Sequence, residues 1–164
     1  MASKLKNLSD FSHTTIPNAK PFKFGIIVAS WNVQITGLLY KGAYDALIKH
    51  NTAENNIISL EVAGSYELVS ASDILLQSQE VDAVICLGCV IQGETKHFDF
   101  ICNAVANGLL NVGLKYTKPV IFGVLTTDNL QQAQDRAGGI HGNKGEEAAI
   151  TAIKMAHITN NINS

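Results

Sequence analysis

The chain has 164 residues, of which 46% are hydrophobic and 16% are charged, and its formal net charge is −2. This length and composition are typical of one globular domain with its own core, and they exclude disordered and collagen-like chains. Lysine and arginine are scattered along the chain without forming a basic stripe, so nucleic acid is not an expected partner.

The amino-terminal stretch MASKLKNLSDF has no apolar core of signal-peptide length, and no later apolar run is long enough to span a membrane. We therefore expect a cytoplasmic protein without a membrane partner. Residues 1–21 are expected to form an amino-terminal arm, in which SHTTIP (residues 12–17) could add an edge strand to a sheet.

A strand followed by an amphipathic helix is predicted next. FGIIVAS (residues 24–30) is a short apolar run rich in β-branched residues, as expected of a strand buried on both faces. After it, apolar residues recur at intervals of three and four, which is the spacing of one helical face. These residues are Ile35, Leu38, Leu39, Ala43, Ala46 and Leu47.

Further strands and helices follow along the chain. The predicted strands are IISLEVA (57–63), DAVICLGCVI (82–91) and PVIFGVL (119–125). The predicted helices cover about residues 66–79, 95–116, 129–136 and 144–157. Such alternation indicates parallel pairing through right-handed crossovers. We expect an α/β fold, a three-layer sandwich around a four-stranded parallel sheet of flavodoxin-like order, as one domain over residues 1–164 with a frayed tail at 158–164.

The three cysteines are expected to be free thiols. Cys86 and Cys89 form a C-x-x-C sequence, but they lie in a predicted strand, where residues three apart point to opposite faces. We therefore expect neither a redox pair nor a metal site here.

Ligands of parallel sheets collect at the carboxyl ends of the strands, so the loops after the four strands are the candidate site. In the third loop, QGETKHF, Gly93 allows the backbone to approach a ligand closely, and Thr95 can cap the next helix or present its hydroxyl. Free N–H groups in the first helical turn favour an anion such as phosphate. A plain helix cap would explain the same turn.

His97 lies in that first turn, where the helix dipole favours a neutral imidazole that can accept or donate a proton. A solvent-facing or capping histidine is the alternative. Trp31, followed by Asn32, comes directly after the first strand and offers a flat face for stacking on a heterocycle, or else it covers the core. Glu67 opens the second helix, where the dipole favours a carboxylate whether or not it binds hydroxyl groups.

The segment DRAGGIHGNKG (135–145) places Arg136 before a double glycine and Lys144 after it, so two cations flank a flexible corner. Arginine can clamp a phosphate through two hydrogen bonds. Alternatively, these cations complement the dipole of a helix end.

Five segments taken together resemble the 6,7-dimethyl-8-ribityllumazine synthase family of riboflavin biosynthesis. In order over about residues 22–157, they are SWN, AGSYEL, LGCVIQGETKHFDFICN, VIFGVLTTDN and DRAGGIHGNKGEEAA. The resemblance implies a transferase that joins 5-amino-6-(D-ribitylamino)uracil to 3,4-dihydroxy-2-butanone 4-phosphate, releasing phosphate and water, without a metal or an organic cofactor.

The resemblance also implies roles for residues at matching positions. Trp31 would stack on the pyrimidine ring, with Asn32 beside it. The residues that would hold the ribityl chain are Gly64, Ser65, Tyr66 and Glu67. The residues whose backbone would meet the uracil edge are Cys89, Val90 and Ile91.

The remaining implied roles concern the phosphate, the proton and the closing of the site. The phosphate would be held by Gly93, Glu94, Thr95 and Arg136, with Lys144 nearby, and Arg136 and Lys144 would be catalytic residues together with His97. His97 would transfer protons, and Phe122 would close a site lying between neighbouring subunits. Two positions depart from the family: Ala63 stands where proline is common, and Glu94 stands where a small residue is common. Because Glu94 is negative, we expect its side chain to point away from the anion.

Members of the family form pentamers, often packed into icosahedral shells, and the short corner at 138–143 permits such a shell. Riboflavin synthase is a further partner that the resemblance suggests. Three alternatives remain open: a non-catalytic lumazine or flavin carrier, a purely structural shell protein, and an archaeal-type riboflavin synthase. A carrier would have no need of Thr95, Arg136 and His97 together.

Overall fold

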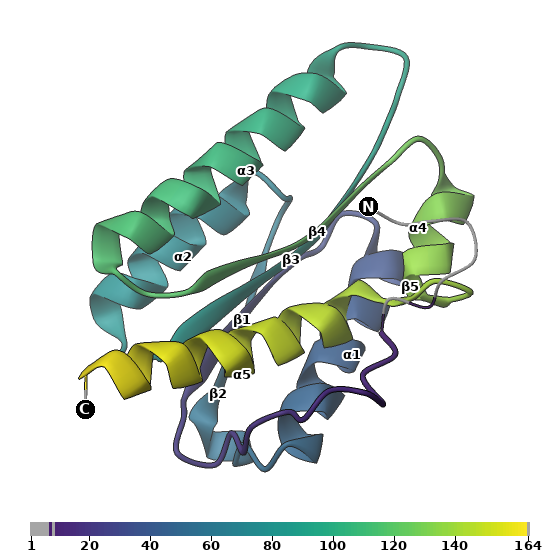
Figure 1. Ribbon diagram of the computed structural model, residues 1–164. Helices are drawn as coiled ribbons and strands as arrows, with labels where there is room; N and C mark the ends of the chain where they lie inside the picture. Colours follow the sequence, from purple (N-terminus) through teal and green to yellow (C-terminus); the bar gives the residue numbers. More distant parts are fainter. Residues whose placement is uncertain (1–6, 8, 164) are drawn as a thin grey trace.

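The computed structural model describes residue 7 and residues 9–163, and in this part of the chain a four-stranded parallel sheet forms with the order β2-β1-β3-β4. The strands are β1 (Phe24–Ala29), β2 (Ile57–Val62), β3 (Ala83–Ile91) and β4 (Val120–Thr127). All of their pairings are parallel (Figure 1). The predicted α/β fold and strand order are confirmed.

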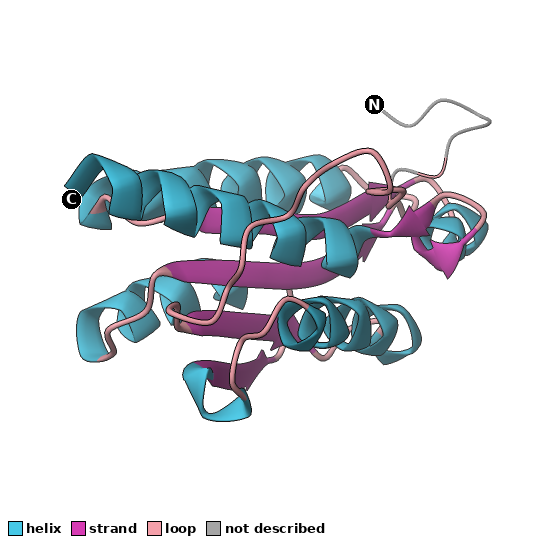
Figure 2. Cartoon of the chain, turned by 60° about the horizontal axis from the view of Figure 1, so that its bottom comes forward, coloured by secondary structure: helices cyan, strands magenta, loops and turns pink. Residues whose placement is uncertain are grey.

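Helices cover both faces of this sheet. The helices are α1 (Val33–Lys49), α2 (Glu67–Ser78), α3 (His97–Tyr116), α4 (Leu130–Arg136) and α5 (Lys144–Asn163), with a 3₁₀ turn, η1, at Glu54–Asn56. Helices α2 and α3 pack on one face, whereas α1 and α5 pack on the other, which gives the three layers seen in Figures 1 and 2.

The central strand β3 explains why the apolar runs are continuous. Ile85 and Leu87 belong to the core under α1 and α5, whereas Val84 and Cys86 belong to the core under α2 and α3. Since both faces are covered, residues of either parity must be apolar. Cys89 lies in the first core and Cys86 in the second, so the expected opposite orientation is confirmed, and all three cysteines are free.

Helices α1 and α5 pack with their backbones in close approach. A Cβ atom built on Gly145 would overlap the carbonyl oxygen of Leu39, so only glycine fits at this crossing. Helix α1 follows the loop after β1, and α5 follows the hairpin after α4. The contact between the two helices therefore links two connections that are far apart in the sequence.

The expected amino-terminal edge strand is wrong, because no described residue before Phe24 lies in a strand. Phe11 and Ile16 instead pack against the core under α1 and α5, and His157 Nε2 of α5 lies 2.9 Å from the carbonyl oxygen of Asn18. Pro17 lacks an N–H group and would interrupt a strand ladder. Residues 1–6 and 8 of the expected arm lie outside the described residues.

The carboxyl end also differs from the prediction, since α5 continues past the expected end at His157 and reaches Asn163. No glycine or proline occurs in residues 158–163, so nothing in the sequence ends the helix there. The Thr159 hydroxyl donates to the Met155 carbonyl at 3.1 Å within this helix. Ser164, the last residue of the expected frayed tail, is outside the described residues.

The corner after α4 is not an irregular loop. It forms a short antiparallel hairpin of β5 (Ala137–Gly139) and β6 (Gly142–Asn143). Gly138 and Gly142 have φ angles of 109° and 83°, which favour glycine.

Of the helices between residues 9 and 163, none combines the length and the apolar character that a membrane span requires.

Candidate active site

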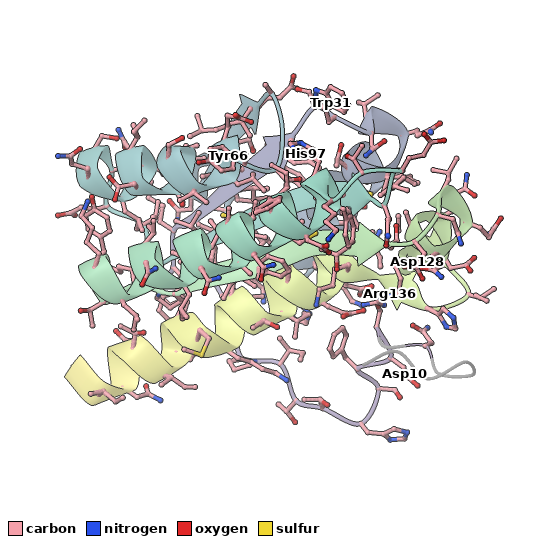
Figure 3. All side chains as sticks on the ribbon, turned by 90° about the horizontal axis from the view of Figure 1, so that it is seen from above. Asp10, Trp31, Tyr66, His97, Asp128 and Arg136 are labelled. Atoms are coloured by element: carbon pink, nitrogen blue, oxygen red, sulfur yellow. The ribbon has the colours of Figure 1, made fainter. Side chains whose placement is uncertain are left out.

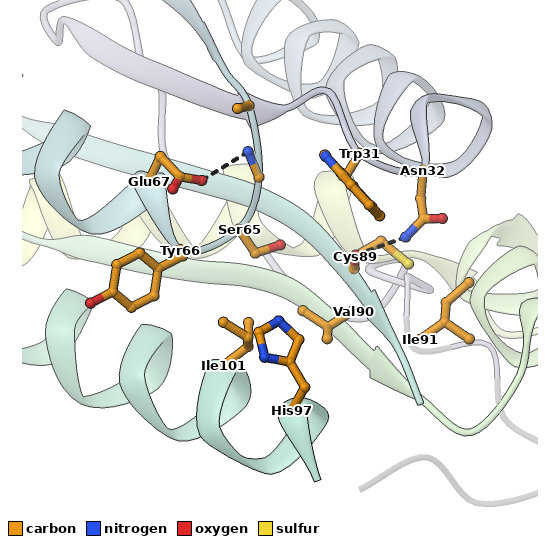
Figure 4. A pocket seen from close by; sticks show the side chains of 12 residues that line it. Trp31, Asn32, Ser65, Tyr66, Glu67, Cys89, Val90, Ile91, His97 and Ile101 are labelled. Atoms are coloured by element: carbon orange, nitrogen blue, oxygen red, sulfur yellow. Dashed lines mark hydrogen bonds between the residues drawn. The ribbon is translucent and has the colours of Figure 1, made fainter. Parts of the chain in front are cut away.

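A pocket of about 670 Å³ opens where the chain leaves the carboxyl ends of β1, β2 and β3 (Figure 4). We call it the sheet-end pocket. Its lining residues are Trp31, Asn32, Ala63, Gly64, Ser65, Tyr66, Glu67, Cys89, Val90, Ile91, His97 and Ile101. The volume suits a small organic ligand. The loops after β1, β2 and β3 meet at this pocket, whereas no residue of the loop after β4 lines it.

Two aromatic side chains stand exposed at this pocket. Trp31 is 73% exposed and Tyr66 is 58% exposed. The backbone below Trp31 is fixed, because Ser30 N donates to Val62 O at 2.8 Å and Trp31 N donates to Ala63 O at 3.1 Å. A tryptophan that covers the core would be buried, so this exposure favours a surface for stacking on a ligand.

Asn32 joins the loop after β1 to β3. Its backbone is left-handed, with φ 60° and ψ 45°, a conformation that asparagine tolerates better than most residues. Its Nδ2 donates to the Cys89 carbonyl at 3.0 Å (Figure 4). This hydrogen bond orients the Asn32 side chain across the floor of the pocket.

The end of β3 exposes backbone groups toward the pocket. The pairing of β3 with β1 ends at Val28 and Leu87, whereas its pairing with β4 continues to Ile91 and Thr127. Alternate residues of a strand direct their N–H and C=O groups to opposite sides. Gln92 N donates to Thr127 O of β4, so Cys89 and Ile91 face the open side, and Val90 contributes its side chain to the pocket.

Glu67 is fixed at the start of α2. The Gly64 N–H donates to Glu67 Oε2 at 3.0 Å, which holds the carboxylate over the turn between β2 and α2. A carboxylate has about four acceptor positions, so Glu67 can still accept hydrogen bonds from ligand hydroxyl groups.

His97 is the first residue of α3, and its backbone N–H lies 3.4 Å from Thr95 Oγ1. Figure 4 shows the imidazole directed into the pocket beside Val90 and Ile101. Ile101 was not anticipated as a lining residue, although it follows His97 by four positions and therefore shares its helical face.

Burial raises the pKa of Cys89 to about 11, so the pocket presents a neutral thiol there.

Six expected site residues lie outside this pocket in the same chain. Gly93, Glu94 and Thr95 are exposed in the connection between β3 and α3, beside His97. The others are Phe122, Arg136 and Lys144. Phe122 lies in register with Cys86, near the amino end of β4, whereas the pocket is at the carboxyl end of the sheet. Figure 3 shows Arg136 well away from Trp31 and Tyr66.

Arg136 lies in a charged region separate from the sheet-end pocket. We call this region the Arg136 corner (Arg136, His141, Lys144 and Glu147). Its Nη1 lies 2.8 Å from Glu147 Oε1, its Nη2 donates to Glu147 Oε2 at 3.0 Å, and Nη1 also donates to the His141 carbonyl at 2.7 Å. Lys144 Nζ is 3.6 Å from Glu147 Oε2. Glu147 was not among the predicted site residues. Its position three residues after Lys144, in the first turn of a predicted helix, is the signal that could have revealed the Lys144–Glu147 pair.

A profile of the 6,7-dimethyl-8-ribityllumazine synthase family matches residues 21–160. The chain belongs to this family. A lumazine synthase of Cytophaga hutchinsonii is 61% identical over 155 residues, covering 94% of this chain and 97% of the relative. A lumazine synthase of Flavobacterium johnsoniae is 56% identical, covering 96% and 83%, and one of Porphyromonas gingivalis is 51% identical, covering 95% and 97%.

Lumazine synthase membership confirms the resemblance drawn from the five sequence segments. It also directs attention to the sheet-end pocket, where the SWN, AGSYEL and LGCVIQGETKHF segments converge. As for metals, residues 7 and 9–163 contain no group of three or more His, Cys, Asp or Glu side chains arranged to hold an ion.

Proposed function

We propose that the chain, acting as one lumazine-synthase-like domain, condenses 5-amino-6-(D-ribitylamino)uracil with 3,4-dihydroxy-2-butanone 4-phosphate. The products are 6,7-dimethyl-8-ribityllumazine, phosphate and water. The observation that carries this proposal is the convergence of an exposed indole, a fixed carboxylate and an imidazole on one pocket in a chain of this family.

The sheet-end pocket would hold the uracil substrate. Trp31 stacks on the pyrimidine ring, and the backbone groups of Cys89 and Ile91 that face away from β4 meet its polar edge, the Cys89 carbonyl through a position that Asn32 leaves free. Glu67 accepts hydrogen bonds from the ribityl hydroxyls. The other residues assigned to this substrate are Asn32, Gly64, Ser65, Tyr66 and Val90.

The chemistry begins with an imine between the uracil amine and the ketone, followed by phosphate elimination, ring closure and dehydration. Both reactants are intrinsically reactive, so holding them in register supplies most of the acceleration. His97 transfers protons at the reacting atoms, because its imidazole is directed into the pocket next to the phosphate-binding turn.

The phosphate would bind the turn at Gly93 and Thr95, where backbone N–H groups precede α3. The Glu94 side chain is exposed there and contributes only its backbone. Arg136 and Lys144 supply the positive charge that neutralises the leaving phosphate. Because these two residues lie outside the pocket of their own chain, they act on the site of a neighbouring copy, together with Phe122.

Such a shared site requires a homo-oligomer, which we propose is a pentamer or an icosahedral assembly of pentamers in the cytoplasm. Helix α3 supports an interface, since three large apolar side chains on it are exposed: Phe100 at 73%, Leu110 at 61% and Leu114 at 68%. Light scattering after size exclusion would measure the assembly, and an active monomer would contradict the shared site. Riboflavin synthase, which uses the product, is a proposed further partner.

The direct test mixes the two purified substrates with the protein, without added metal, and follows the absorbance of the lumazine product. We expect the product to form in proportion to the enzyme concentration. Tight binding of lumazine without any turnover would instead identify a carrier and overturn the proposal.

A further inference from the structure

The contacts of Arg136 use only part of its guanidinium group. Glu147 occupies the edge formed by Nη1 and Nη2 through two hydrogen bonds, at 2.8 and 3.0 Å. The His141 carbonyl takes a further N–H of Nη1 at 2.7 Å. A guanidinium carries five N–H donors in one plane, so these contacts fix the direction of the whole plane.

Two donors remain on the adjacent edge of the guanidinium, which shares Nη2 with the edge that Glu147 occupies. They are the Nε–H and the second N–H of Nη2, for which the described residues show no acceptor. In a planar guanidinium these two N–H groups are parallel and match two oxygens of a phosphate. The pair with Glu147 therefore leaves a complete phosphate-binding edge unused.

The charges of the corner also leave an excess for an anion. Arg136 and Lys144 are positive and Glu147 is negative, so the three together carry a net charge of +1. The side chains of Arg136 and Glu147 are only 13% and 14% exposed, so water screens this charge less than it would on an open surface.

Glu147 is itself held in place. It lies in the first turn of α5, and Ser9 Oγ lies 3.3 Å from its Oε1. Ser9 Oγ also accepts the N–H of Asn143 at 2.7 Å, next to the start of α5. The carboxylate is thus a fixed support against which the guanidinium is oriented.

We propose that Glu147 is a positioning residue for phosphate: it orients Arg136 so that the edge formed by Nε and Nη2 faces the butanone phosphate. This inference rests on the proposed function. Glu147 touches no substrate, and its effect on the reaction passes through Arg136.

The test compares Glu147→Gln with Glu146→Gln. Both variants remove one negative charge from the first turn of α5, but Glu146 makes no ion pair within the described residues. In Glu147→Gln an amide replaces one carboxylate oxygen and cannot accept from both Nη1 and Nη2. We expect the KM for the butanone phosphate to rise about tenfold, with the inhibition constant of inorganic phosphate rising alike.

The KM for the ribitylaminouracil provides the internal control, because a merely structural role of Glu147 would alter both substrates. We expect that KM to stay within about twofold of the wild type, and Glu146→Gln to match the wild type for both substrates. A tighter phosphate interaction in Glu147→Gln would show that Glu147 competes for Arg136, and this would overturn the proposal, as would equal losses for both substrates.

Two further variants keep the test decisive. Glu147→Asp retains the charge but withdraws the carboxylate by one methylene, so we expect a KM increase of about threefold for the phosphate substrate alone even if Glu147→Gln does not fold. In an Arg136→Gln background, adding Glu147→Gln should change that KM by less than about twofold, because the two residues act as one unit. An inactive wild type would refute the proposed function, whereas an active wild type with unaffected Glu147 variants would refute this inference alone.

Discussion

The sheet-end pocket and the Arg136 corner prepare for ligands in opposite ways. In the pocket, Trp31 and Tyr66 are 73% and 58% exposed, and the backbone beneath them is fixed by hydrogen bonds between loops. In the corner, the Arg136 side chain is only 13% exposed and is already paired with Glu147. An aromatic side chain can be exposed to water before the ligand binds without a charged partner. A partly buried cation, by contrast, needs a partner that both neutralises its charge and orients it.

The largest expected effect tests whether the two regions serve one site across two chains. Arg136→Gln should lower kcat/KM for the butanone phosphate about a hundredfold, because the phosphate loses a bidentate cationic partner. The double variant Trp31→Ala/His97→Ala should lose at least as much. When equal amounts of the two inactive chains are unfolded and assembled together, roughly a quarter of the sites should combine an intact pocket with an intact corner.

Mixed assemblies should therefore recover roughly a quarter of wild-type activity. Each variant assembled alone is the control. If the mixture stays as inactive as its components, the pocket and the corner do not meet across chains. The two regions would then not belong to one shared active site.

The second prediction concerns the contact that ties the regions together. Gly145→Ala should lower the free energy of unfolding by about 3 kcal/mol, since its methyl group would overlap the Leu39 carbonyl where α5 crosses α1. Gly37→Ala, in the same α1 helix with no atom near the new methyl group, should instead raise it by about 0.5–1 kcal/mol. Urea denaturation at one protein concentration measures both; equal effects would show that the crossing is not tight.

A third change addresses the exposed indole. Trp31→Ala should raise the KM for the ribitylaminouracil about thirtyfold through lost stacking, while Trp31→Phe should retain most of the affinity. Because the side chain is 73% exposed, the free energy of unfolding should change by less than about 0.5 kcal/mol. A large loss of stability in Trp31→Ala would mean that the indole covers the core after all.

The smallest effect is expected at the imidazole. His97→Ala should lower kcat about tenfold with little change in either KM, because the two reactants are reactive once they are aligned. Steady-state kinetics over a pH series would measure this. Full turnover at saturating substrates would remove His97 from the proton-transfer role.

The sequence predicted the sheet and the loops of the pocket because both follow from local pattern. Both faces of β3 are buried, so its run from Ala83 is apolar throughout and easy to recognise. The loops after β1, β2 and β3 then meet, since parallel strands end at the same edge of a sheet. The opposite orientations of Cys86 and Cys89 followed from the same periodicity.

The errors arose where contacts between distant segments decide the structure. SHTTIP has a composition compatible with a strand, but its Ile16 and the neighbouring Phe11 pack against the core under α1 and α5. Asn18 also meets His157 of α5, so this segment runs along helices instead. Glu147 and Arg136 are eleven positions apart, and the hairpin of β5 and β6 brings them together. No local sequence pattern predicts this pairing. Tertiary contacts of this kind leave little trace in periodicity.

The left-handed backbone of Asn32 limits how this pocket can be re-engineered. Glycine and aspartate keep that conformation at modest cost, but neither can donate a hydrogen bond to the Cys89 carbonyl as the asparagine amide does. A library aimed at accepting altered heterocycles should therefore vary the neighbouring indole at position 31 freely and leave position 32 unchanged.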